Sequence, residues 1–199
     1  MSKLGTLVSV HYTENKRFYD QCDAGHQLSH VALVAAEADR INKELGSPYS
    51  TELVVAAAMW HDIFSTKEHR DVHEQKAADY VLEHQQDHVI LTSFTKEEII
   101  LISNAIRQHR ASYKGEYSSK LSEIIAAADR GNPDLDKMLR RVIKIKMDVY
   151  SMDYDTAYSE GIIHLKEKFG KNGYAKYPKL YQDMYSSEIQ DLQNKLESL

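Results

Sequence analysis

The chain has 199 residues, of which 42% are hydrophobic and 28% are charged, and its formal net charge at pH 7 is -5. This length supports one domain with a full hydrophobic core and argues against two large domains. The negative net charge argues against a polymeric DNA or RNA partner, whereas local basic patches still allow small anionic ligands.

The single cysteine, Cys22, excludes an internal disulfide framework and fits a reducing compartment. The first ten residues lack the apolar segment of a signal peptide. No run approaches the roughly 18 apolar residues that are needed to span a bilayer. We therefore expect a cytoplasmic protein with no membrane partner.

Apolar residues recur at helical spacing along the chain, which contains only eight glycines and three prolines. This pattern predicts an all-α fold without a sheet. The expected helices cover about 24–45, 50–62, 72–83, 96–110, a segment that follows the loop 111–117 and ends near 129, 133–150, 153–169 and 177–199. We expect a single domain over 1–199, with a core over about 20–135 and a helical C-terminal extension over about 136–199.

Three local patterns indicate where helices begin. Asp71 stands three residues before Glu74, and Thr95 stands three residues before Glu98, which is the spacing of a capping box. Asn132-Pro133 is typical of a cap residue followed by a proline at the first helical position. Helix starts are therefore expected at these three points.

Polar residues stand at positions where apolar helices should face the core. His61 and Asp62 end the apolar run 53–60, and burying an imidazole beside a carboxylate is costly unless both are satisfied. A divalent metal ion satisfies both at once. His30 and Asp129 lie on two further apolar helices. Three helices that each present a polar ligand inward predict a metal site in a bundle core.

The order His30, His61-Asp62, Asp129 resembles the H…HD…D motif of the HD superfamily of metal-dependent phosphohydrolases. The segments 25–31, 56–63 and 125–130 around these residues are similar to the family's motifs as well, and the resemblance covers roughly 20–135. It implies an HD-type helical bundle that holds a divalent ion, Mn²⁺, Fe²⁺, Co²⁺ or Mg²⁺, through His30, His61, Asp62 and Asp129.

The reaction that the resemblance implies is hydrolysis of a phosphoester or phosphoanhydride by attack of metal-bound water. The substrate that we expect is a small phosphorylated molecule, and within that class a nucleotide. His73 and His109 are expected in the site beside Asp62, either as ligands of a second metal or as contacts to the phosphate. Gln108-His109 replaces the paired histidines of many two-metal members, so a second metal stays open.

Positive residues gather near the expected mouth of the site, where they would bind phosphate. We assign Arg107, Arg110, Lys114 and Lys146 to substrate binding. Arg140 and Arg141 are instead interpreted as part of a solvated helix face, which is the usual place of such charge runs.

Two other functions compete with the hydrolase. A di-iron oxygenase on the same fold would require both His73 and His109 to bind a second iron. A helical module could also keep the metal for stability alone. Ile63 to Ser65 lack the residues that follow the His-Asp pair in alarmone hydrolases, in some nucleoside monophosphatases and in cyclic dinucleotide phosphodiesterases, so these subfamilies are disfavoured. A homo-oligomer remains open.

Overall fold

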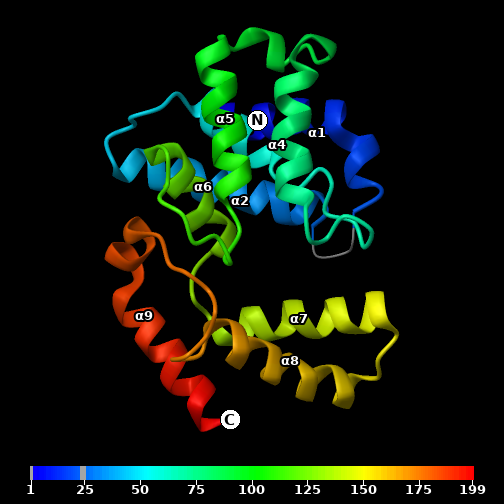
Figure 1. Cartoon of the computed structure of the whole chain (residues 1–199), viewed down its shortest axis with the longest axis vertical. Helices are drawn as coiled ribbons and strands as arrows, with labels where there is room; N and C mark the ends of the chain where they lie inside the picture. Colours follow the sequence, from blue (N-terminus) through cyan, green and yellow to red (C-terminus); the bar gives the residue numbers. More distant parts are fainter. Residues whose placement is uncertain (1, 23–25) are drawn as a thin grey trace.

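The computed structural model describes residues 2–22 and 26–199, and this part of the chain contains nine α-helices, two short 3₁₀ helices and no strand (Figure 1). The helices are α1 Lys3–Tyr19, α2 Leu28–Glu44, α3 Thr51–Trp60, α4 His73–Glu83, α5 Lys96–Gln108, α6 Lys120–Arg130, α7 Leu135–Tyr150, α8 Tyr154–Phe169 and α9 Lys179–Ser198. The predicted all-α fold is confirmed. None of the described helices combines the length and apolarity of a membrane span.

Helix α3 lies at the centre of the main core. Every residue from Leu53 to Trp60 is buried, and the helix packs against α1, α2, α5 and α6. A helix that is apolar on all sides is stable only where neighbours surround it. The chain therefore delivers His61 and Asp62, which follow α3 directly, to the interior of the bundle.

Helix α1 has no counterpart among the helices expected from the sequence. Its buried residues are His11, Asn15 and Tyr19, so it offers a polar stripe where an apolar one is normally sought. The Trp60 indole N–H donates to Nδ1 of His11 over 3.2 Å, and the Asn15 amide donates to the Met59 carbonyl over 3.3 Å. These bonds satisfy the buried N–H groups of the Trp60 indole and the Asn15 amide, and they hold α1 on α3.

Two histidines, one on α1 and one between α4 and α5, are buried. His11 is 1% exposed and His88 is 3% exposed. The imidazole of His88 stands edge-on to Trp60 and shares a hydrogen bond of 2.9 Å with the Tyr80 hydroxyl. Both imidazoles are stable in the interior because each contacts Trp60 from a distant segment of the chain.

Two predicted helix starts are corrected. Helix α4 has Val72 rather than Asp71 at its N-cap and no side-chain cap bond, and the side chain that caps α7 belongs to Asp134 rather than Asn132. The capping box of Thr95 and Glu98 at the start of α5 is present. Helix α2 begins at Leu28, and residues 24 and 25 of the predicted helix lie outside the described part.

Helices α7 and α8 form an antiparallel pair, and with α9 they lie on one side of the bundle (Figure 1). The pair turns at Ser151, which adopts a left-handed conformation with φ 56°. A second hydrophobic cluster joins α8 to the end of α9 through Leu165, Phe169, Leu192 and Leu196. The first half of α9 packs on the main core instead, so α9 connects the two clusters.

Candidate metal centre

Three helices bring the four predicted ligands together. His30 lies in the first turn of α2, His61 and Asp62 follow α3, and Asp129 lies at the end of α6. Nε2 of His30 is 3.1 Å from Oδ1 of Asp129, and Nε2 of His61 is 3.1 Å from Oδ2 of Asp62. One ligand atom from each residue lies within 4.8 Å of the others. This spacing suits one cation at the centre of the group.

A second cluster adjoins the first through Asp62. Nε2 of His73, at the start of α4, is 3.2 Å from Oδ1 of Asp62, and Nε2 of His109, which follows α5, is 3.5 Å from the same oxygen. Oδ2 of Asp62 faces His30 and His61. The two oxygens of one carboxylate thus serve two neighbouring groups of ligands.

Backbone carbonyl groups orient three of the histidines. Nδ1 of His61 donates to the Ala58 carbonyl over 2.6 Å, Nδ1 of His109 donates to Ile106 over 2.6 Å, and Nδ1 of His73 donates to Arg70 over 3.0 Å. A carbonyl oxygen can only accept, so the hydrogen of each neutral ring sits on Nδ1. Nε2 of each ring then offers a lone pair toward Asp62, as in metal-binding histidines.

Three buried polar atoms of the two clusters lack hydrogen-bond partners. These atoms are Nε2 of His30, Nε2 of His61 and Oδ1 of Asp62. A buried polar atom without a partner costs about 1–3 kcal/mol. In the second cluster, Nε2 of His73 and Nε2 of His109 lie 3.4 Å apart, so two lone pairs face each other. Divalent cations would relieve both arrangements, and the residues therefore fit a metal.

The electrostatics of the clusters agree with this fit. Burial alone would lower the pKa of His61, but Asp62 and Asp129 outweigh it and raise that pKa to about 10. Burial opposes the charge of both carboxylates, yet the surrounding histidines hold the pKa of Asp62 and of Asp129 well below the usual range. Burial lowers the pKa of His109, which favours the neutral form that binds metals.

The family model described as the HD domain matches residues 28–132, which is more than half of the chain and includes all of these ligands. The chain belongs to the HD domain family. No curated protein and no solved structure matches it. HD domains bind divalent metal ions and are in general metal-dependent hydrolases of small phosphorylated molecules.

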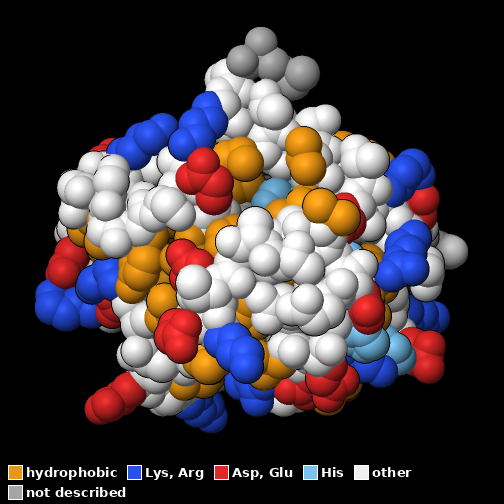
Figure 2. Space-filling view, turned by 90° about the horizontal axis from the view of Figure 1, so that it is seen from above, with side chains coloured by type: hydrophobic (Ala, Val, Ile, Leu, Met, Phe, Trp, Pro, Cys, Tyr) orange, Lys and Arg blue, Asp and Glu red, His pale blue; other side chains and the backbone are white. Residues whose placement is uncertain are grey.

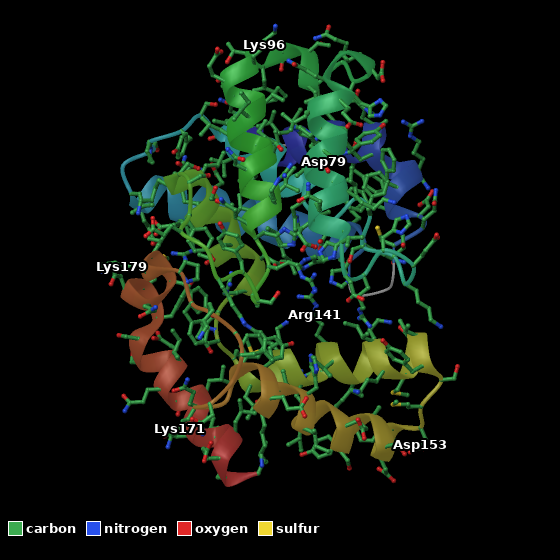
Figure 3. All side chains as sticks on the ribbon, viewed as in Figure 1. Asp79, Lys96, Arg141, Asp153, Lys171 and Lys179 are labelled. Atoms are coloured by element: carbon green, nitrogen blue, oxygen red, sulfur yellow. The ribbon has the colours of Figure 1, made fainter. Side chains whose placement is uncertain are left out.

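A cavity of about 700 Å³ opens between the HD domain and helices α7 and α8. The metal-centre residues Asp62, His73, His109 and Asp129 line its inner wall. The facing wall comes from beyond residue 132, and Figure 3 shows Arg141 on α7 lying between this helix and the core. The cationic residues that line the cavity are Arg70, Arg110, Arg130, Arg141, Lys146 and Lys168.

The facing wall also has an apolar part. It consists of Met138, Val142, Ile145, Leu165 and Phe169, with the rings of Tyr150 and Tyr174 nearby. On the face of the HD domain remote from α7–α9, acidic and basic side chains are interspersed (Figure 2). In contrast to that face, the cavity combines gathered positive charge with an apolar surface.

The four residues assigned to substrate binding fall into two groups. Arg110 and Lys146 line the cavity. Arg107 lies outside the lining and pairs with Asp79 over 2.6 Å, and Lys114 is exposed in the loop after α5. Arg141, interpreted from the sequence as part of a solvated face, is exposed and also lines the cavity.

Sequence reasoning missed Arg70, Arg130 and Lys168 as lining residues. A usable pattern existed on α7, where Met138, Arg141, Val142 and Ile145 recur on one face. Cationic residues within an otherwise apolar stripe indicate a face that meets both a core and a polar ligand.

Proposed function

We propose that this HD domain protein is a divalent-metal-dependent phosphohydrolase that acts on a nucleotide. The observation that carries the proposal is the cavity, in which two clusters of metal ligands face a wall with both cationic and apolar side chains. Cationic groups suit the phosphate of a nucleotide, and an apolar wall with tyrosines suits its base. A metal kept only for stability would need no such cavity.

His30, His61, Asp62 and Asp129 would hold one ion, and His73 and His109 would hold a second ion that shares Asp62. A bound divalent ion polarises a phosphoryl oxygen and lowers the pKa of a water molecule. Mixed imidazole and carboxylate ligands suit manganese, iron or cobalt, and we propose manganese first. His73 and His109 stay oriented because backbone carbonyls hold their Nδ1 atoms.

Arg110 and Lys146 are proposed to bind the substrate from opposite sides of the cavity. The Arg110 guanidinium is held by the Asp71 carbonyl at 3.0 Å and by Glu74 at 3.3 Å, so it is already oriented. Lys146 on α7 lies 3.7 Å from Glu160. Groups that are fixed before the substrate arrives can neutralise charge on the leaving phosphate without reorganising.

A di-iron oxygenase is the second candidate, because the cluster of Asp62, His73 and His109 supplies the second set of ligands that it requires. The cationic wall favours the hydrolase, since an uncharged organic substrate has no use for it. Metal content and oxygen consumption separate the two. Two irons per chain with oxygen uptake would support the oxygenase, and phosphate release with manganese would support the hydrolase.

The test is a screen of nucleotides with manganese, cobalt and magnesium, with release of phosphate, pyrophosphate and triphosphate measured. Asp62→Ala removes the carboxylate that both clusters share, and we expect it to lower turnover by at least about 100-fold. Asp87→Ala, which alters an exposed aspartate remote from the cavity, is the matched control and should leave turnover unchanged. Equal activity of the wild type and Asp62→Ala would refute the proposed site.

A further inference from the structure

Lys168, in the last turn of α8, is a cation without an anionic partner. Its side chain lines the cavity and makes no hydrogen bond or ion pair with the described residues. Its ammonium stands over the ring of Phe169, 5.0 Å from the ring centroid. Burial lowers the pKa of Lys168, and Arg141, Arg130 and Arg110 lower it further, against the opposite effect of Asp129.

A partly buried ammonium without an ion pair costs free energy in the folded protein. Burying a charge is unfavourable unless an opposite charge or hydrogen bonds compensate it. Here three arginines add positive charge, and one carboxylate, that of Asp129, offsets it in part. A lysine that lies among arginines next to a metal centre is therefore stabilised when an anion binds beside it.

The total charge of the cavity exceeds what one phosphate would need. Among the described residues, six Lys and Arg side chains line it, and two of them, Arg110 and Lys146, pair with glutamates outside the lining. Three carboxylates line it as well, and two of these, Asp62 and Asp129, belong to the metal clusters. A phosphomonoester carries a charge of about -2 at most near pH 7. Metal ions bound in the clusters would add further positive charge. The cavity is thus matched to a longer anion.

We infer, on the basis of the proposed function, that the substrate carries two or more linked phosphoryl groups and that Lys168 with Arg141 binds this phosphoryl chain from the side of the cavity formed by α7 and α8. The reaction is then hydrolysis of a phosphoanhydride. One water is consumed: its oxygen bonds to phosphorus, the bridging P–O bond breaks and its electron pair leaves with the bridging oxygen. The protons of the water pass to the product phosphates or to solvent.

This inference assigns the selection of the substrate to the C-terminal extension. Lys168 and Arg141 lie on α8 and α7, beyond residues 28–132 that match the HD domain. The HD domain would supply the ligands and the extension would select substrates by the number of their phosphates.

A binding titration of the full-length, metal-free protein tests the inference without catalysis. The probes are inorganic tripolyphosphate and orthophosphate, measured by calorimetry. We expect tripolyphosphate to bind more tightly than orthophosphate, and Lys168→Gln to weaken tripolyphosphate binding by about 10-fold or more. Lys171→Gln, which alters an exposed lysine just after α8, is the control and should bind as the wild type does. Equal binding of the two anions, or an unaffected Lys168→Gln variant, would overturn the inference.

Kinetics with manganese then separate the two proposals. For the mono-, di- and triphosphate of one nucleoside, Lys168→Gln should raise KM about 10-fold or more for the triphosphate, change kcat little and barely affect the monophosphate. Lys168→Arg should restore part of the loss. If the wild type prefers the monophosphate, the hydrolase stands and the inference fails. If no nucleotide is hydrolysed, the proposed function fails, and the tripolyphosphate titration alone decides the binding site.

Discussion

Asp62 is the residue on which both clusters depend, because each of its oxygens faces a different pair of histidines. The position follows from the chain itself. An apolar helix that ends in His-Asp places both polar groups where the helix leaves the core. A change at Asp62 affects both clusters, whereas a change at one of the other ligands affects one cluster alone.

His109→Ala should remove one metal ion and keep the other. The variant leaves His30, His61, Asp62 and Asp129 in place, so we expect the number of bound manganese ions to fall from about two to about one per chain. Elemental analysis after gel filtration measures this number. His84→Ala, at a partly exposed histidine outside the cavity, should keep both ions. Two ions in His109→Ala would show that His109 is no ligand.

Metal binding should depend on pH through His61. Its pKa of about 10 means that the metal-free protein carries a proton there at neutral pH, which a cation must displace. Apparent affinity should then rise by about tenfold per pH unit for this one proton between pH 6.5 and 9. Calorimetry in buffers of different ionisation enthalpy reports the released protons. An affinity that does not change with pH would contradict the assignment of His61.

The raised pKa of His61 also makes the stability of the metal-free protein depend on pH. A raised histidine pKa stabilises the folded metal-free protein fully below the unfolded value of 6.5, and this gain is lost as the pH rises toward 10. The lowered pKa values of Asp62 and Asp129 contribute a constant gain in this range, because they matter only near or below 3.8. The increase in Tm on adding metal should therefore grow from pH 6.5 to 9, as scanning calorimetry can measure.

The residues of the metal clusters were predictable because they break an apolar pattern at helix ends. His30, His61 and Asp129 stand out in this way from the sequence alone. Lys168 does not, because a lysine near the end of a helix is normally solvated. Only the position of α8 across the cavity from the HD domain, which brings distant segments together, turns it into a lining residue.

At the scale of elements, the sequence located helix interiors better than helix starts. Periodicity determines where an apolar stripe runs, and it predicted the interiors of α2 to α9 correctly. The start of a helix depends on one local bond, and Asp71 shows that the right spacing does not ensure it. Helix α1 was missed because His11 and Asn15 are buried by hydrogen bonds to a distant helix, which no local pattern reveals.

This difference between caps can be tested on α5 and α4. Thr95→Ala removes an observed capping box and should lower the free energy of unfolding by about 1 kcal/mol. Asp71→Ala removes a side chain that makes no cap bond and should cost less than half of that. Urea unfolding of the metal-loaded variants measures both values. Equal losses would mean that Asp71 caps α4 in solution.

At the scale of the whole molecule, the extension must keep its position relative to the HD domain for the cavity to exist. Arg130 contributes to this position from the end of α6. Its guanidinium donates to the Lys176 carbonyl over 2.7 Å and to the carbonyls of His109 and Arg110 over 3.3 Å. The Lys176 amide in turn donates to the Ala111 carbonyl over 2.7 Å. One side chain thus ties the segment before α9 to the loop that carries His109.

Arg130→Ala should therefore loosen the cavity wall and leave the metal clusters filled. We expect faster hydrogen exchange over 133–178, a higher KM for the substrate, and an unchanged number of bound metal ions, because no ligand is altered. Arg140→Ala, at an exposed arginine of α7, is the matched control and should change none of these quantities. Hydrogen exchange with mass spectrometry and elemental analysis measure the two effects separately. Loss of metal together with faster exchange throughout the HD domain would show instead that Arg130 supports the bundle core, and the extension would then not be a separately positioned wall.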